Sequence, residues 1–474
     1  MNHMYKTLIG LLADWSDPVP TETRTKLRQA REHLPLEFDT EKQFIGRQYA
    51  GCGATIGSMP RCDFACRGCY LNHNANRTPA ESVNGIKQQL NTIRNWLGEG
   101  GNVQITDGEV TLRPATELIE IIRYAKQIGL VPMLMTHGDS FRKSPDLLKR
   151  LVVEAGLSEI SIHIDTTQRG RDGQAYRFAQ SEHALDPLRD EFAEMIRQVR
   201  RETGKTLEAA TTVTVTKNNI EQVRFIIEWL CHNSDAFKMI SFQPLAQVGR
   251  TDNELAGVSS IDELWSQIAL GLNGKASSDK SSSDHARSFG HPACTRFSQG
   301  LVVDIDHQEP AFHPLFPLDD ARAATFLEQF CNRFGGISFR SASRWQKIYR
   351  MFGILLHDPK FAFFSMIPFA WRTMTALRPQ ALVGLLWLHI RGKARINYLN
   401  IVSHHFMSRQ EIETELGRER LDACVFKVPV NGELISMCEV NALGIREKYY
   451  ATLNSEPVSA EHETYSPTKQ QHYQ

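Results

Sequence analysis

The 474-residue sequence predicts an α/β fold, a partial (βα)6 TIM-like barrel followed by an α+β C-terminal domain. Between about residues 52 and 245, short runs rich in Val, Ile, Thr and Met alternate with longer helix-like stretches. Several of the short runs are apolar throughout, which is typical of parallel strands buried on both faces. Repeated strand-then-helix units form parallel sheets with right-handed crossovers, and such a sheet would curl into part of a barrel.

The expected barrel contains six strands, each of the first five followed by a helix. The predicted strands span residues 52–58, 102–106, 131–136, 159–165, 210–216 and 238–245, and the predicted helices span residues 80–98, 114–128, 144–155, 184–203 and 219–232. Ser144-Pro145-Asp146 and Asn219-Ile220-Glu221 contain residue types that begin helices. In folds of this kind the active site lies at the carboxyl ends of the strands.

The remaining segments are expected to flank this core. Residues 1–45 are predicted to form an N-terminal helical extension, 46–250 the core barrel, 251–290 a helix and polar linker, 291–454 a cysteine-containing C-terminal domain, and 455–474 a disordered tail. The linker prediction depends on a polar, low-complexity stretch over residues 273–289.

The composition excludes several classes of protein. Hydrophobic residues make up 41% and charged residues 23%, as in ordinary soluble globular proteins. Basic and acidic residues both number 54, so no overall field attracts nucleic acid, and none is expected as a partner. The nine cysteines are odd in number and clustered, which argues against a secreted disulfide framework. The short apolar stretch over residues 7–13 is shorter than a usual signal core, which favours a cytoplasmic protein.

A cysteine triplet follows the first predicted strand. Cys62, Cys66 and Cys69 have C-x3-C-x2-C spacing, and no fourth cysteine stands nearby. Three thiolates can hold three irons of a [4Fe–4S] cluster, which leaves one position open for chemistry. A zinc site completed by His73 is the alternative, and the strand context favours the open cluster.

With Tyr70 after it, this triplet resembles the motif of the radical S-adenosylmethionine (SAM) superfamily. The resemblance implies two cofactors, a [4Fe–4S] cluster on the three cysteines and SAM on the fourth iron. It also implies an electron donor such as flavodoxin or ferredoxin, and reductive cleavage of SAM to a radical that abstracts hydrogen from a substrate.

The resemblance extends to residues after later strands. Asp107-Gly108-Glu109-Val110-Thr111-Leu112 stands where the family carries G-G-E-P-T-L, with Asp107 and Val110 replacing Gly and Pro. It assigns Gly108, Glu109 and Thr111 to the amino group of SAM, although Glu109 alone could be a helix-entry carboxylate.

Further cofactor contacts are implied after the first and fourth strands. The ring of Tyr70 would lie near the adenine, and Asp165 would contact the ribose or the substrate. His163 is equally a barrel-lining or a core residue. Arg169 or Arg171 would pair with the SAM carboxylate, or both would be solvated.

The other cysteines suggest a second site. Cys424 and Cys438 flank a predicted β-hairpin that turns at Asn431-Gly432, which would bring the two thiols close together. An auxiliary iron–sulfur cluster held by Cys294, Cys424 and Cys438 is favoured over a disulfide in a reducing compartment. Cys331 is a weaker candidate for a fourth ligand. Cys52 and Cys231 are expected to be inert core residues.

The C-terminal passage from His404 to Ala442 resembles archaeal tetraether-lipid synthases and related pterin-methylating radical SAM proteins, which carry auxiliary clusters. Residues 361–401 add short apolar runs interrupted by Arg and Lys, each too short for a membrane span of about 20 residues. Such a segment suits an interfacial helix or a lid over an apolar tunnel, or equally an ordinary pair of core helices.

The expected reaction is hydrogen abstraction from an unactivated C–H bond, with a hydrophobic small molecule or a lipid chain as the leading substrate. Methylation of a pterin-like molecule, modification of a peptide, and a catalytically inert cluster- or zinc-binding protein remain open. Peripheral contact with the inner face of the membrane is a further expectation.

Overall fold

The computed structural model describes residues 18–258, 260–273, 286–305, 308–317, 319–340, 344–377 and 391–455. The expected tail from residue 456 onward, most of the polar linker, and part of the 361–401 segment therefore lie outside the described residues.

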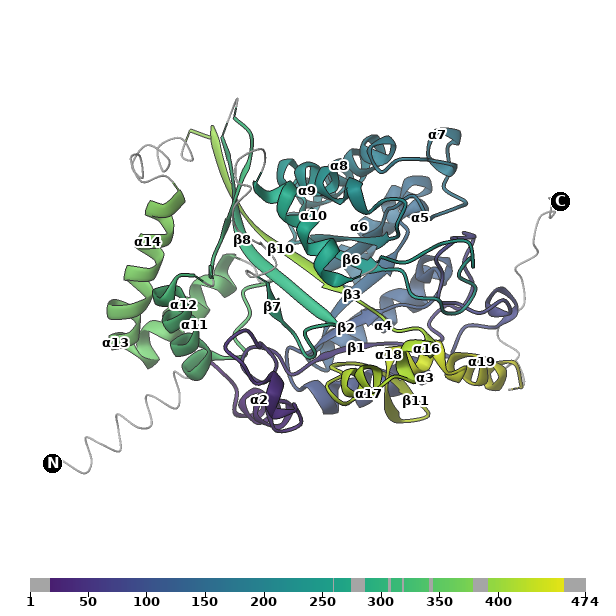
Figure 1. Ribbon diagram of the computed structural model, residues 1–474, viewed down its shortest axis with the longest axis horizontal. Coiled ribbons are helices and arrows are strands. Elements are labelled where there is room, and N and C mark those ends of the chain that lie inside the picture. The colour runs from purple at the N-terminus through teal and green to yellow at the C-terminus, as the bar shows by residue number, and fades with distance from the viewer. Residues whose placement is uncertain are drawn as a thin grey trace.

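One twelve-stranded mixed sheet organises the molecule (Figure 1). Its centre is six parallel strands in chain order, β1 (Cys52–Ala54), β2 (Asn102–Ile105), β3 (Val131–Thr136), β4 (Glu159–His163), β5 (Glu208–Val215) and β6 (Phe237–Pro244). All six correspond to predicted strands. This confirms the predicted α/β partial barrel.

Helices pack along the outer face of these strands. They are α3 (Val83–Leu97), α4 (Ala115–Gln127), α6 (Pro145–Glu154), α8 (Asp186–Thr203) and α9 (Val223–His232), with α10 (Ile261–Asn273) beside α9 and the short α5 (Asp139–Lys143) and α7 (Gln174–Arg177) in the connections. The side chain of Ser82 caps α3 by accepting from the Gly85 N–H. Such a cap satisfies a backbone donor that a helix start leaves unpaired.

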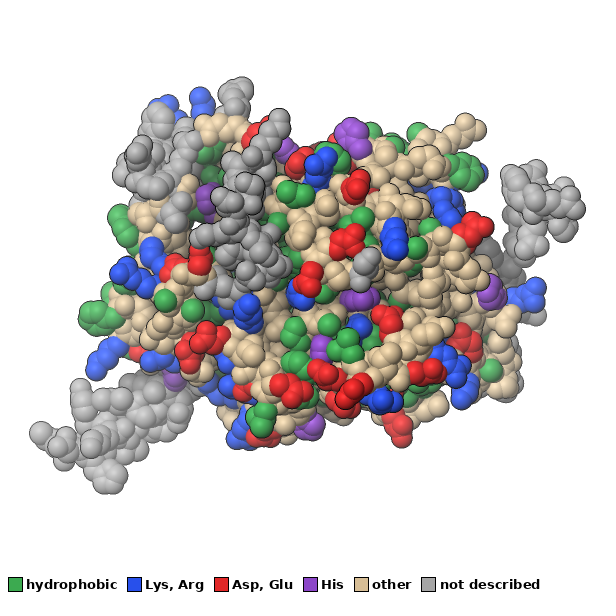
Figure 2. Space-filling model, in the orientation of Figure 1, with side chains coloured by type: hydrophobic (Ala, Val, Ile, Leu, Met, Phe, Trp, Pro, Cys, Tyr) green, Lys and Arg blue, Asp and Glu red, His purple; other side chains and the backbone are tan. Residues whose placement is uncertain are grey.

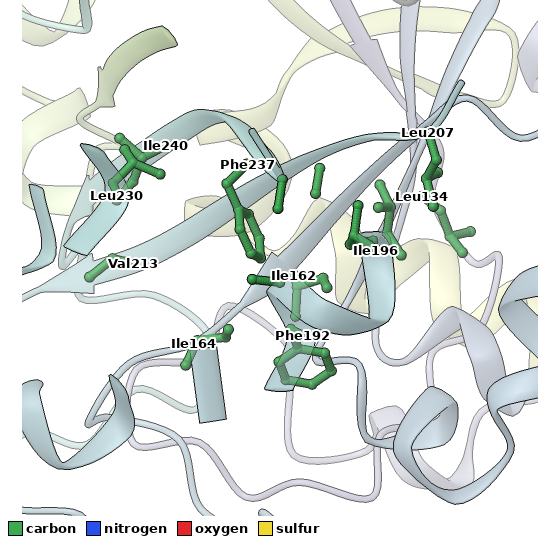
Figure 3. Packing of buried hydrophobic residues seen from close by; sticks show 14 of the residues in the cluster. Leu134, Ile162, Ile164, Phe192, Ile196, Leu207, Val213, Leu230, Phe237 and Ile240 are labelled. Carbon is green, nitrogen blue, oxygen red and sulfur yellow. The ribbon is translucent and has the colours of Figure 1, made fainter. Parts of the chain in front are cut away.

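The largest core lies between these helices and the sheet. Figure 3 shows Leu134 and Ile162 of the strands near Phe192 and Ile196 of α8. All four side chains are fully buried. Each such side chain contributes about 1.5–3 kcal/mol to stability. The opposite face of the strands points inward and lines the interior of the barrel.

The later part of the chain adds strands to both edges of the same sheet. Beside β6 lies β10 (Ala394–His404), followed by β8 (Thr295–Ile305) and then β7 (Arg287–Ser288), with β9 (Ala311–Pro314) paired to β8. Beside β1 lies β11 (Phe426–Val430), which forms the predicted hairpin with β12 (Glu433–Ser436). The turn residues Asn431 and Gly432 both have positive φ, as an Asn-Gly hairpin turn requires.

Two further groups of helices flank the sheet (Figure 1). The first group, at one side, consists of α11 (Ala321–Phe334), α12 (Arg344–His357), α13 (Pro359–Phe361), the π-helical turn η7 (Ala362–Met366) and α14 (Ile367–Leu377). The second group lies near β11 and α3 and consists of α16 (Arg409–Ile412), α17 (Glu415–Asp422), α18 (Met437–Ala442) and α19 (Ile445–Ser455). Helix α2 (Thr21–Glu32) precedes the sheet. None of the helices in the described part of the chain is long and apolar enough to cross a bilayer.

Candidate active site

The loop that carries the cysteine triplet leaves β1 at the carboxyl end of the sheet. Loops after β4 and β6 hold it there through backbone hydrogen bonds: the Ala65 N–H donates to the Arg169 carbonyl at 2.8 Å, and the Arg250 N–H donates to the Cys69 carbonyl at 3.0 Å. The Arg250 side chain also donates from Nε to Cys69 Sγ at 3.3 Å. A cation that donates to a cysteine sulfur stabilises its thiolate form.

The three cysteine side chains are partly buried, and the pKa values of Cys62 and Cys66 are raised. Burial, and then the neighbouring Cys69, raises the pKa of Cys66 to about 12. Burial and the neighbouring Cys66 raise the pKa of Cys62 as well. Thiols of this kind stay protonated until a metal centre supplies positive charge. The donor set therefore fits an iron–sulfur cluster.

The spacing of the donors bears on the zinc alternative. His73 is exposed, and among the described residues the metal-type donors that all lie within 4.8 Å of one another are Cys62, Asp63 and His137. A single zinc ion would draw its sulfur ligands to within about 4 Å of one another. Because Cys62, Cys66 and Cys69 do not form so tight a group, their spacing favours a cluster over one ion.

A cavity of about 200 Å³ opens beside the triplet. Of the predicted site residues, Cys62, Cys66, Cys69, Tyr70, Gly108 and Glu109 line it, together with His163, which the sequence left between lining and core. Other residues that line it come from the C-terminal part of the chain: Phe406, Phe426, Met437 and Asn441. The cavity thus joins the barrel interior to segments far along the chain.

Gly108 lies in van der Waals contact with the backbone just before the triplet. Its N–H donates to the Met59 carbonyl at 2.8 Å. A Cβ at this position would lie 2.5 Å from the Pro60 carbonyl oxygen and 2.4 Å from that of Arg61. Only glycine permits so close a backbone approach.

The Glu109 carboxylate is buried and fully engaged by protein donors. It accepts from the hydroxyl of Thr136 at 2.6 Å, from the His137 N–H at 2.8 Å and from the Thr111 N–H at 3.1 Å. Glu109 therefore joins the loops after β2 and β3 and also caps the short turn over Val110–Leu112. Thr111 supports this carboxylate and does not line the cavity.

Asp165 lies behind the cavity wall. Its carboxylate accepts from the N–H groups of Thr167 and Thr214, both at 2.7 Å, and contacts His163 Nε2 at 2.5 Å. Burial acts to raise the pKa of Asp165, but His163 and these hydrogen bonds hold it well below its usual range. The structure thus places Asp165 as the partner of His163, whose ring lines the cavity.

The two predicted arginines are held by protein groups. Arg171 is buried and forms an ion pair with Asp139 at 2.8 Å. The Arg169 guanidinium donates to the carbonyls of Thr166 and Gln168, both at 2.8 Å.

Several residues that complete this region carry no local sequence signal. The ring of His137 stacks on Phe64 with centroids 3.7 Å apart, and its Nε2 lies 2.7 Å from an Asp63 carboxylate oxygen. Arg250 stands alone after the last barrel strand. The loop after β6 brings it to the cysteine loop, although β6 lies five strands from β1 in the sheet.

Asp107 has a role that its motif position did not predict. It forms a buried ion pair with Arg446 of α19, and the Gly57 N–H donates to the same carboxylate at 2.5 Å. The Arg446 guanidinium lies 4.8 Å from the centroid of the Tyr70 ring, and the Tyr70 hydroxyl donates to the Asp107 carbonyl. The aspartate that replaces a glycine of the family motif thus attaches the C-terminal helix to the site.

A second group of cysteines assembles near β11. Burial is the main cause that raises the pKa of Cys438, and the nearby Cys424 and Cys294 raise it further. Arg420 Nε donates to Cys294 Sγ at 3.2 Å, and the Met407 N–H donates to Cys438 Sγ at 3.4 Å. The structure therefore brings together the three cysteines predicted as an auxiliary site.

Three other cysteines lie away from both groups. Cys331 belongs to α11 and packs with Phe44 and Leu327. Burial raises the pKa of its thiol to about 11, although the nearby Arg47 and Arg287 act to lower it. Cys231 is buried in α9, and Cys52 donates to Asn102 Oδ1 at 3.6 Å.

The combination of a parallel half-barrel and a C-x3-C-x2-C loop after its first strand defines a class of SAM-dependent iron–sulfur proteins. No protein-family model matches the chain. Over 202 residues it is 28% identical to the 7,8-dihydro-6-hydroxymethylpterin dimethyltransferase of Methanocaldococcus jannaschii, which covers 42% of this chain and 38% of that protein. This similarity to a pterin dimethyltransferase supports the resemblance to the radical SAM superfamily that the cysteine motif indicates.

Solved structures give weaker matches. Methylornithine synthase is 16% identical with a TM-score of 0.34 and covers 55% of this chain and 76% of that one. The enzyme anSMEcpe, solved with bound AdoMet and the Cp18Cys peptide, is 12% identical with a TM-score of 0.30 and covers 40% of this chain and 50% of that one.

Proposed function

We propose that this protein is an enzyme that holds a [4Fe–4S] cluster on Cys62, Cys66 and Cys69 and binds SAM in the adjacent cavity. The observation that carries the proposal is the position of the three thiols, which line one cavity at the carboxyl ends of the barrel strands. When bound, the reduced cluster supplies the electron that cleaves SAM to methionine and a 5′-deoxyadenosyl radical, which removes hydrogen from a substrate.

The residues of the chain would orient and enclose the cofactors. Arg250 donates to Cys69 Sγ and stabilises the thiolate. Gly108 permits the strand-two loop to lie against the cysteine loop. Tyr70 presents a partly buried ring to the cavity, and Phe406, Phe426 and Met437 would help to exclude water from it.

A hydrophobic molecule with an unactivated C–H bond, such as a lipid chain, is the substrate that we propose. The apolar wall of Phe406, Phe426 and Met437 supports this choice, because apolar side chains stabilise an alkyl chain in a binding site. Methyl transfer to a pterin-like molecule is the second candidate, and the similarity to the pterin dimethyltransferase supports it.

We also propose an auxiliary iron–sulfur cluster on Cys294, Cys424 and Cys438. Arg420 donates to the first sulfur and a backbone N–H to the third, as is common around cluster thiolates. Met437 lines the main cavity and Cys438 follows it directly, so this cluster would lie next to the substrate. A flavodoxin or ferredoxin would supply the electrons.

Anaerobic reconstitution tests both iron sites. With dithionite and SAM, the reconstituted protein should form 5′-deoxyadenosine, and the triple Cys62→Ala, Cys66→Ala, Cys69→Ala variant should form none. The same variant should retain iron at the auxiliary site. A Cys52→Ala, Cys231→Ala variant is the matched control and should keep both iron and activity.

Two outcomes would count against these proposals. Intact cluster absorbance without 5′-deoxyadenosine in the unmodified protein would refute the enzymatic function. Iron that falls to zero in the triple variant would refute the auxiliary cluster. Mass spectrometry of substrates distinguishes the reactions, since methyl transfer adds carbon to the product whereas hydrogen abstraction alone does not.

A further inference from the structure

Helix α12 displays its apolar side chains outward. Of the nineteen large hydrophobic side chains that are exposed among the described residues, ten lie between Trp345 and Trp371. In α12 all of them except Met351 recur every three or four residues and so share one face of the helix: Trp345, Ile348, Tyr349, Phe352 and Leu356. Trp345 is 79% exposed and Tyr349 is 77% exposed. An ordinary surface helix has the reverse arrangement.

The other face of α12 explains this orientation. Ile354 is buried and packs in one cluster with Phe334 and Phe361. Arg350, one turn earlier, donates to the Ser338 carbonyl. These contacts fix the helix by its mixed basic and apolar side, so the aromatic stripe faces away from the protein.

The following helices repeat the pattern. Phe364 and Trp371, of η7 and α14, are 81% and 64% exposed, and Phe363 and Ile367 are exposed beside them. On the inner side Phe369 stacks on Phe326 of α11 with centroids 3.9 Å apart. The exposed side chains therefore belong to packed helices, and their exposure is built into the fold.

The charge of this segment is strongly asymmetric. Between residues 341 and 395 the sequence contains nine Lys or Arg residues and a single acidic residue, Asp358, although the whole chain is neutral. Asp358 is paired with Arg333 at 3.0 Å, and Arg372 of the segment is paired with Asp320. Figure 2 shows basic and hydrophobic side chains along the left edge of the molecule, where Figure 1 places these helices.

We propose that the exposed face of α12, η7 and α14, here called the docking face, binds the surface of an anionic lipid bilayer. Aromatic and aliphatic side chains would enter the boundary between headgroups and acyl chains, and the surrounding cations would contact lipid phosphates. The excess of cations favours an anionic membrane over a second copy of the chain as the binding partner, because two such positively charged faces would repel each other. The docking face is separate from the cysteine sites, so this inference goes beyond the proposed function.

Vesicle co-sedimentation of the full-length protein tests the inference. At low salt the protein should bind phosphatidylcholine vesicles that contain phosphatidylglycerol and bind pure phosphatidylcholine vesicles much more weakly. High salt should reduce the bound fraction, since it screens the cations. Replacing Trp345, Phe352, Phe364 and Trp371 by Ser should weaken binding at least about tenfold.

The matched control replaces four exposed hydrophobic residues elsewhere, Leu36, Val153, Leu270 and Leu416, by Ser and should bind as the unmodified protein does. Circular dichroism and cluster absorbance should be the same in both variants, which separates docking from folding and from the cysteine sites. Absence of binding to anionic vesicles, equal binding by the docking-face variant, or dimerisation through this face in light scattering would each overturn the proposal.

Discussion

At the scale of single residues, the site depends on close contacts that local patterns do not reveal. Cys62, Cys66 and Cys69 are recognisable because their spacing lies within eight positions of the chain. Arg250, which donates to Cys69, follows 181 residues later, and His137 comes from the loop after β3. No periodicity marks either residue as a neighbour of the triplet, because only the loops of the folded barrel bring them there.

Replacing Gly108 by Ala should displace the cysteine loop. The added methyl group would overlap the carbonyl oxygens of Pro60 and Arg61, directly before the first ligand. We expect iron retention per chain after anaerobic desalting to fall well below that of the unmodified protein, with secondary structure by circular dichroism preserved.

Gly100→Ala is the control for this substitution, because a Cβ there meets nothing within 4 Å. Its positive φ costs about 1 kcal/mol of stability on substitution, without an effect on iron. Full iron retention in the Gly108→Ala variant would show that the close approach is unnecessary.

At the scale of elements, the strands were more predictable than the surfaces they present. The apolar, β-branched runs of β1 to β6 fall within a few residues of their predicted bounds, and Asn431-Gly432 marked the β11–β12 hairpin. Helix α12 was not predicted. Its apolar stripe has helical period, but such a stripe ordinarily marks a core-facing side, and the sequence alone does not tell which way the helix turns.

The predicted roles of Glu109 and Asp165 illustrate a related limit. Both carboxylates follow barrel strands, as a sequence pattern can indicate. The structure shows that each accepts several hydrogen bonds from neighbouring strands and loops. Such partners are set by the spacing between strands, which the sequence does not specify.

The ion pair between Asp107 and Arg446 should couple α19 to the loop after β2. We expect Asp107→Asn and Arg446→Met each to lower the free energy of unfolding by about 3–5 kcal/mol, because each leaves a buried group without its partner. The double variant should lose clearly less free energy of unfolding than the sum of the losses in the two single variants. Urea denaturation followed by circular dichroism measures all three.

Arg409→Met is the control for this set of single and double variants. Arg409 pairs with Glu413 at 3.3 Å on the surface, so its loss should cost no more than about 1 kcal/mol. Additive effects of the Asp107 and Arg446 substitutions would contradict the coupling.

At the scale of the whole molecule, one sheet joins parts that the sequence analysis treats separately. Cys52 pairs with Phe426, and Asn400 pairs with Met239. Sequential strands usually neighbour one another, so pairings across such sequence distances have no local signal. The sequence therefore predicted the six central strands and the β11–β12 hairpin, but not that β11 and β10 would border the central strands.

This arrangement predicts cooperative unfolding. Urea unfolding should give the same transition by circular dichroism and by tryptophan fluorescence. Trp229 and Trp265 pack in the main core, and the strands at both edges belong to the same sheet. A chain of residues 1–290 should fail to fold, because β1 and β6 would lose β11 and β10 and leave open edges. Two separate transitions, or a soluble and folded fragment, would contradict this expectation.

The pairing of β1 with β11 also sets an order of events during protein synthesis. The cysteine triplet leaves the ribosome early, but the strand that precedes it acquires its neighbour only after residues 426–430 have emerged, and Asp107 gains its cation only after Arg446 has. Until then the three thiols lie on an incomplete sheet edge. Insertion of iron into the finished site is thus a step that follows translation of nearly the whole chain, and a nascent protein must keep these thiols from oxidation until that moment.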